Sequence, residues 1–279
     1  MKKISKKIKL IYRQIASWRA RQRFNQLIAN GLPEFLHPPL LFLLDGKLST
    51  EHQEKLDKIE KVRAGIANRG SETVSVYQSP DTDPEKGVTP GQMKDRTFER
   101  IAYLTSIKPR WGTFLYLCAL HSRAKTILEL GGCAGISGCF MASSQYCENF
   151  ITIEGSPDLA ELANNSLNQV VDNATVINLL FDEALDDLLP SLKSGLDMVH
   201  IDGQHEKMAT LHYFERVIPF LNSGALVIFD DIRWSSGMWE AWQQIRHRKG
   251  LALSITMERS GLCVWEGGET EGSAFEFSN

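Results

Sequence analysis

The chain has 279 residues, of which 43% are hydrophobic and 23% charged, and its formal net charge is −3. These values are ordinary for a globular protein and allow one large α/β domain, or a domain of roughly 190 residues with an extension. The small negative charge argues against a dedicated nucleic-acid-binding protein. No apolar run approaches the roughly 18 residues that a membrane span needs, and no secretory signal is recognised. Because the five cysteines show neither CxxC spacing nor a disulfide framework, a cytoplasmic location is the simplest interpretation.

Basic residues are concentrated at the start of the chain. Nine of the 31 precede the first acidic residue, Glu34, which leaves 22 basic against 34 acidic residues in the remainder. Residues 4–30 are predicted to form a basic amphipathic helix, because apolar side chains recur there near helical spacing. Such a helix can pack on its own domain or on the mate of a homodimer. The alternative is peripheral attachment to an anionic lipid surface.

Two further features precede residue 91. A helix is predicted from a cap at Ser49 or Thr50 to about Asn68, where Gly70 ends it. Residues 79–91 are polar and rich in proline and glycine, which indicates a loop or linker of the kind that often forms a lid. We therefore divide the chain into an N-terminal basic helical extension with its linker, residues 1–90, and a second domain, residues 91–279.

The second domain is predicted to contain an α/β sheet. Helices are expected near 92–106 and 110–122, and strand-like runs follow them along the chain. The first five strands alternate with helices, which is typical of a parallel, doubly wound sheet. The last two are separated by four residues and should form an antiparallel hairpin, giving a seven-stranded Rossmann-like sheet. The predicted strands are Thr126–Leu130, Phe150–Glu154, Thr175–Leu179, Asp197–Asp202, Ala225–Asp230, Leu251–Thr256 and Gly261–Trp265.

The first predicted strand runs into a glycine-rich turn. Gly131, Gly132 and Gly135 allow the backbone to turn sharply and to approach a ligand where a Cβ would collide. Their spacing is GxxxG, not the GxGxxG of dinucleotide-binding proteins, which cradles a pyrophosphate. The second strand ends at Glu154–Gly155, about 20 residues further on, where a carboxylate can accept hydrogen bonds from both hydroxyls of a ribose.

Four stretches in order, ILELGGCAGIS, ITIEGSPDLAELA, DMVHIDGQHEK and GALVIFDDIRW, resemble the motifs of class I S-adenosylmethionine-dependent methyltransferases. Within that class the resemblance is to bacterial small-molecule O-methyltransferases related to the macrocin and catechol enzymes, over roughly residues 91–267. It implies S-adenosylmethionine as the cofactor. This molecule has no phosphate but an amino-acid end, which suits a nearby carboxylate such as Glu129. The resemblance also places Phe181 and Asp182 at the adenine, although Asp182 is equally suited to cap a helix.

The same resemblance implies a candidate metal site. In the metal-dependent members, an acid on the fourth strand and an Asp-Asp or Asp-Asn pair on the fifth hold a Mg²⁺-like ion; the matching residues here are Asp202, Asp230 and Asp231. Such an ion would lower the pKa of a substrate hydroxyl and orient it. Asp202 is also expected to contact the cofactor. The alternative is that these acids cap helices or touch cofactor and substrate without a metal.

His205 is the candidate general base, with Asp202 as the second catalytic residue. His205 stands three residues after Asp202, where the catechol-type enzymes carry a lysine, and a neutral imidazole can accept a proton at pH 7. Its alternative role is a structural or substrate-orienting hydrogen bond. The chain departs from the macrocin-like pattern at Gln204, where an acid is usual and where an amide cannot take a proton. Trp234 is a candidate wall of the acceptor site, and His200 is expected in the core.

These features favour an S-adenosylmethionine-dependent methyltransferase that acts on an oxygen of a small molecule. One alternative keeps the fold and cofactor without a metal and methylates nitrogen, carbon or a macromolecule. Another is a non-catalytic cofactor-binding or membrane-associated protein, in which Gln204 marks lost chemistry.

Overall fold

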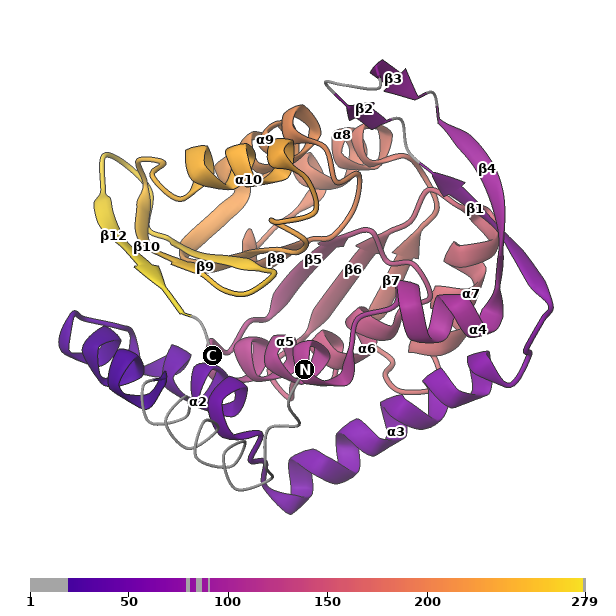
Figure 1. Cartoon of the computed structure of the whole chain (residues 1–279), viewed down its shortest axis with the longest axis horizontal. Coiled ribbons are helices and arrows are strands. Elements are labelled where there is room, and N and C mark those ends of the chain that lie inside the picture. Colours follow the sequence, from indigo (N-terminus) through magenta and orange to yellow (C-terminus); the bar gives the residue numbers. More distant parts are fainter. Residues whose placement is uncertain (1–19, 79–80, 84–86, 90, 278–279) are drawn as a thin grey trace, which may run out of the picture.

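The computed structural model describes residues 20–78, 81–83, 87–89 and 91–277. Its centre is a mixed sheet of eight strands in the order β12-β10-β11-β9-β8-β5-β6-β7 (Figure 1). The strands are β5 (Thr126–Leu130), β6 (Asn149–Ile153), β7 (Ala174–Ile177), β8 (Leu196–Ile201), β9 (Leu221–Phe229), β10 (Leu251–Thr256), β11 (Gly261–Trp265) and β12 (Glu271–Glu276).

The predicted parallel sheet and its closing hairpin are confirmed. Strand β5 pairs in parallel with β6 and β8, and β9 continues the parallel part beside β8. Strands β10 and β11 form the antiparallel hairpin, and β11 inserts next to β9. The sheet has one strand more than the seven predicted, because β12 pairs in parallel with β10 at the edge. Its side chains are mostly exposed and show no apolar alternation, so the pattern did not reveal it.

Helices cover both faces of the sheet. Since successive side chains of a strand point to opposite faces, Ile127 of β5 packs into one buried cluster and Leu128 into the other. The first cluster includes side chains of α2, α3, α5, α6 and α7, and the second those of α8, α9 and α10. The bounds are α2 (His37–Asp45), α3 (Thr50–Ala67), α5 (Pro109–His121), α6 (Ile136–Ala142), α7 (Pro157–Leu167), α8 (Phe181–Ser191), α9 (Lys207–Val217) and α10 (Ser236–Ile245), with short turns η1 (Glu34–Leu36) and η3 (Ile218–Phe220).

The N-terminal helices share the core of the sheet. Residues 20–29 are helical, and Phe24 and Leu27 are buried in the same cluster as α5. The rest of the predicted basic helix, residues 4–19, lies outside the described residues. Helix α3 begins as predicted, because the Ser49 hydroxyl accepts a hydrogen bond from the backbone N–H of His52. The division of the chain at residue 90 and the homodimer stay predictions.

A β ribbon replaces part of the predicted loop and of the helix predicted at 92–106. Strands β1 (Thr73–Gln78) and β4 (Gln92–Thr97) pair antiparallel, and the short strands β2 (Asp81–Asp83) and β3 (Gly87–Thr89) form a hairpin between them. The helix prediction is wrong for Gln92–Thr97, because this polar segment satisfies its backbone groups by pairing with β1. Helical structure starts only at α4 (Phe98–Arg100), capped by the Thr97 hydroxyl, and continues as the π-helical turn η2 (Ile101–Thr105).

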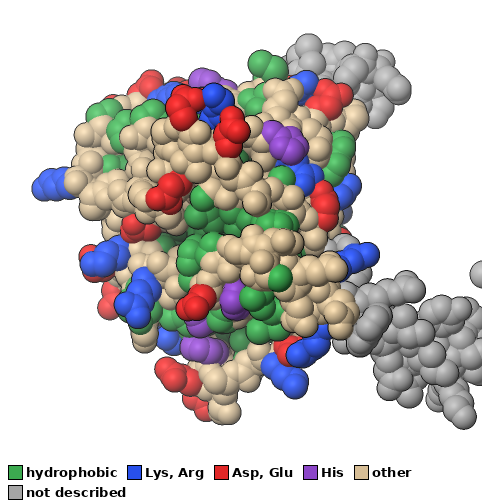
Figure 2. Space-filling view, turned by 90° about the vertical axis from the view of Figure 1, so that its left-hand side faces the viewer, with side chains coloured by type: hydrophobic (Ala, Val, Ile, Leu, Met, Phe, Trp, Pro, Cys, Tyr) green, Lys and Arg blue, Asp and Glu red, His purple; other side chains and the backbone are tan. Residues whose placement is uncertain are grey.

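The surface combines apolar and charged regions (Figure 2). No helix in the described part of the chain is long and apolar enough to cross a bilayer. Figure 2 shows the face on the left of Figure 1, where hydrophobic side chains gather in the middle and charged side chains lie mainly around them. Among the described residues, Trp234 and Leu104 are the most exposed of the large apolar side chains, at 68% and 67%.

Candidate active site

A cavity of about 460 Å³ lies beyond the carboxyl ends of β5, β6 and β8. This is the edge at which doubly wound sheets bind ligands, and the volume falls in the usual range for small-molecule sites. Six of the predicted site residues line it: Gly131, Glu154, Gly155, Phe181, Asp182 and Asp202. The other lining residues are Val76, Tyr77, Thr105, Cys133, Leu159, Leu180, Glu183, Gly203, Gln204 and Tyr213.

The glycine turn forms one wall of the cavity. Gly131 has φ +101°, a conformation that other residues rarely adopt. A Cβ on Gly131 would lie 2.3 Å from the backbone oxygen of Asp202, so the β5 and β8 ends approach each other only because this residue is glycine. Gly135, with φ +77°, precedes α6 and packs against Ala163 of α7. Gly132 and Gly135 are buried behind the cavity wall.

Glu154 is held by backbone donors from two sides. Its Oε2 accepts a hydrogen bond from the N–H of Cys133 and its Oε1 from the N–H of Ser156, each at 2.8 Å. Burial raises the pKa of Glu154, and these hydrogen bonds oppose the rise. The carboxylate therefore joins the glycine turn to the end of β6 and lines the cavity, with lone pairs left for a ligand's hydroxyl groups.

Glu129, in contrast, does not line the cavity. It is fully buried inside β5, where Oε2 accepts a hydrogen bond from the Thr152 hydroxyl at 2.8 Å. Nδ1 of His200, on the neighbouring strand β8, lies 3.2 Å from Oε1. His200 is in the core, as predicted, at 1% exposed. The expected contact of Glu129 with the amino-acid end of a cofactor stays a prediction.

The β ribbon and the start of α8 form the other side of the cavity. The backbone N–H of Tyr77 donates to the Ser156 hydroxyl at 2.6 Å, which fixes β1 beside Glu154. The Phe181 ring packs edge-on against Tyr213, with centroids 5.2 Å apart. Asp182 lies in the first turn of α8, whose cap is Leu180, and its Oδ1 accepts a hydrogen bond from Arg216 at 3.1 Å.

Three carboxylates and a histidine meet beside the cavity. Nε2 of His205 lies 3.8 Å from an oxygen of Asp202 and 3.8 Å from an oxygen of Asp231. Burial lowers the pKa of His205, whereas burial and the nearby carboxylates of Asp230 and Asp231 raise that of Asp202 well above its usual range. Close to the imidazole stands the exposed Trp234 ring, with centroids 5.8 Å apart.

Gln204 and three residues that were not predicted, Tyr77, Tyr213 and Arg259, complete the site. Gln204, with φ +48°, is turned so that its side-chain oxygen accepts a hydrogen bond from the Tyr213 hydroxyl at 2.9 Å. Arg259, in the turn between β10 and β11, forms ion pairs with Asp230 and Asp231. No motif marked Tyr77, Tyr213 or Arg259. Tyr77 and Arg259 reach the site from elements distant in the sequence, whereas Tyr213 lies on α9, nine residues after Gln204.

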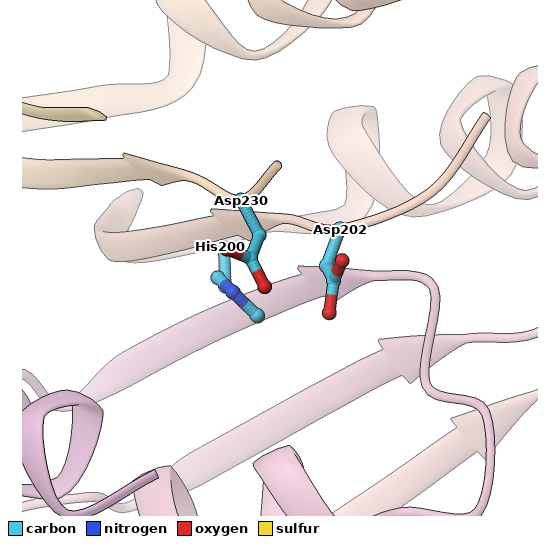
Figure 3. Close-up of side chains that lie close together, drawn as sticks. All are labelled: His200, Asp202 and Asp230. Atoms are coloured by element: carbon cyan, nitrogen blue, oxygen red, sulfur yellow. The ribbon is translucent and has the colours of Figure 1, made fainter. Parts of the chain in front are cut away.

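Two of these carboxylates lie near His200 in an arrangement that could hold a metal ion. Ligand atoms of His200, Asp202 and Asp230 lie within 4.8 Å of one another, a spacing that an ion could bridge (Figure 3). However, Asp230 is 4% exposed and both of its oxygens accept hydrogen bonds from Arg259. The guanidinium thus supplies a positive charge where a divalent ion would bind, and the predicted metal set of Asp202, Asp230 and Asp231 stays a prediction.

Comparisons with known proteins support the fold and class. Residues 128–232 match the family model described as a methyltransferase domain. A catechol O-methyltransferase of Niastella koreensis is 30% identical over 131 residues, which are 46% of this chain and 58% of the relative. A catechol O-methyltransferase of Mycobacterium tuberculosis is 29% identical over 135 residues, which are 48% of this chain and 60% of the relative. The chain thus spans about three fifths of the length of these curated relatives.

Solved structures below 25% identity share the fold. An O-methyltransferase of Bacillus cereus in complex with S-adenosylhomocysteine is 18% identical, with a TM-score of 0.53 over 77% of this chain and 91% of that one. An O-methyltransferase of Streptomyces achromogenes involved in tomaymycin synthesis, in complex with S-adenosylmethionine, is 22% identical. Its TM-score is 0.52, and the match covers 58% of this chain and 82% of that one. Residues 128–232 therefore match a methyltransferase domain, and the chain is similar at modest identity to the catechol O-methyltransferases.

Proposed function

We propose that this protein transfers the methyl group of S-adenosylmethionine to an oxygen of a small molecule of the catechol type. The observation that carries the proposal is Glu154, a partly buried carboxylate that two backbone N–H groups hold in the lining of a cavity that Gly131 also lines. A carboxylate at this strand end suits the two hydroxyls of a ribose. The likeness to catechol O-methyltransferases supports the acceptor class.

The residues around the cavity fit this cofactor. Because Gly131 has no Cβ, its backbone can lie close to that of Asp202; a Cβ would fill the space between them. Phe181 and Leu180 offer apolar contacts for a flat base, and Asp202 also lines the cavity. When bound, the cofactor supplies an electrophilic methyl group. The protein's part is then to hold an acceptor oxygen in line with that group and to remove its proton.

His205 is the proposed base. Burial keeps its imidazole neutral at pH 7, so that a nitrogen lone pair can accept the hydroxyl proton. The imidazolium that forms is stabilised by Asp231, 3.8 Å from Nε2, and by the nearby carboxylate of Asp230. The exposed Trp234 ring beside His205 offers a flat apolar surface for an aromatic acceptor.

A transfer assay tests the proposal. The purified protein is incubated with S-adenosylmethionine labelled in its methyl group and with 1,2-dihydroxybenzenes, monophenols, aromatic amines and total RNA in parallel. We expect label in the 1,2-dihydroxybenzenes, in the form of a methyl ether. Label in the amines or RNA alone would contradict O-methylation, and label in none of the acceptors would contradict the acceptor class.

A further inference from the structure

Arg259 stands where a metal-dependent enzyme of this kind needs its ion. Its Nε donates to Oδ1 of Asp230 at 3.0 Å, and its Nη2 donates to Oδ2 of Asp230 at 2.9 Å and to Oδ1 of Asp231 at 2.7 Å. The guanidinium therefore binds both carboxylates that follow β9. A two-point contact of this kind is among the strongest that a carboxylate makes in a protein.

The lone pairs of Asp230 are used within the protein. Its Oδ1 also accepts hydrogen bonds from the Asp231 N–H and from the Ser260 hydroxyl, both at 2.9 Å. With the Arg259 bond, this oxygen has three donors, which leaves it no free lone pair for a metal. At Oδ2, which accepts from Nη2 of Arg259, a divalent ion would meet the charge of the guanidinium a few ångströms away beside a buried carboxylate, where repulsion is weakly screened.

The hairpin holds Arg259 in this position. The backbone N–H of Ile232 donates to the carbonyl of Arg259 at 2.9 Å, and the turn is closed by the hydrogen bond from Met257 to the carbonyl of Ser260 at 2.8 Å. Gly261 of β11 lies against the ring of Trp242, where a Cβ would come within 2.4 Å. The turn is thus tied to the end of β9 by its backbone as well as by the Arg259 side chain.

We propose that Arg259 is the resident cation of this site and takes the place of a divalent metal. It neutralises Asp230 and Asp231, keeps both carboxylates in position beside His205, and makes transfer independent of added metal. Arg259 is thus a positioning residue, since it acts through the two carboxylates. This inference rests on the proposed function for its role in transfer, but its claim about metal binding can be tested without any acceptor.

Direct metal binding is the test. The wild-type protein is titrated with Mn²⁺ and followed by the electron paramagnetic resonance signal of the free ion, and by calorimetry with Mg²⁺. We expect no saturable binding to the wild type at millimolar metal. In Arg259→Met, which keeps the length of the side chain but removes its charge, the freed carboxylates should bind one Mn²⁺ at least roughly tenfold more tightly. The double variant Arg259→Met/Asp230→Asn should lose this binding again.

Each result decides the inference. Stoichiometric binding of one Mn²⁺ to the wild type would overturn it, and so would a folded Arg259→Met protein with no gain in affinity. If Arg259→Met does not fold, as judged by circular dichroism, the wild-type titration decides alone. Binding of S-adenosylhomocysteine is measured on the same samples. Its absence would remove the proposed function, whereas the metal titration would still report on Arg259.

Discussion

Replacing Gly131 by alanine is expected to abolish binding of S-adenosylhomocysteine and to lower the free energy of unfolding by roughly 2–4 kcal/mol. The added Cβ would lie 2.3 Å from the backbone oxygen of Asp202, and backbone atoms cannot rotate away as a side chain can. The backbone at Gly131 also has φ +101°, which alanine adopts only with strain. The free energy is measured by urea denaturation and the affinity by calorimetry.

Gly65→Ala is the matched control. Gly65 lies in the last turn of α3, and a Cβ there meets no atom within 4 Å. Since alanine favours a helix over glycine, we expect this variant to gain about 0.5–1 kcal/mol of stability and to bind the ligand as the wild type does. Wild-type unfolding and binding by Gly131→Ala would show that the β5 turn does not form the cavity wall.

Replacing His205 by glutamine is expected to lower the rate of methyl transfer by about 10²–10⁴-fold, the usual contribution of a positioned base. The amide retains the size and polarity of the side chain but cannot accept a proton. Binding of S-adenosylhomocysteine should be unchanged, since His205 does not line the cavity. His247→Gln, at an exposed position after α10, is the control and should transfer at the wild-type rate.

The pH dependence of the same reaction checks the assignment. A base works in its neutral form, so protonation of His205 should stop transfer. Because burial lowers the pKa of His205, the rate should stay constant around neutral pH and fall only as the pH drops through that lowered pKa. His205→Gln should lack this acid limb. A variant that retains both the rate and the limb would show that another group takes the proton.

The buried strands could be predicted because the apolar runs and turn residues that specify them are adjacent in the sequence. Strands β5, β10 and β11 have the predicted bounds, since each is an apolar run closed by turn residues, and the four-residue spacer specifies the hairpin. Pattern reasoning failed for β4 and β12, where polar segments become strands only because a partner strand supplies hydrogen bonds. Neither segment buries a periodic apolar face that would reveal it.

The residues of the site can likewise be divided into those that the sequence predicts and those that only the fold brings together. Gly131 and Glu154 follow strands whose carboxyl ends must meet, so the topology alone brings them to one cavity. Glu129 has the expected residue type, but its neighbours Thr152 and His200 on adjacent strands enclose it in the sheet. Arg259 was missed because it is 29 residues from Asp230 along the chain, and only the pairing of β11 with β9 brings them together.

Calorimetric titration with S-adenosylhomocysteine tests the central claim most directly. We expect the wild-type protein to bind one molecule and Glu154→Ala to weaken the affinity about a hundredfold or more, because two hydrogen bonds to a charged acceptor are lost. Glu154→Gln, which keeps the shape of the side chain and part of its hydrogen bonding, should bind with intermediate affinity. No binding by the folded wild-type protein, or equal binding by Glu154→Ala, would contradict the cofactor site.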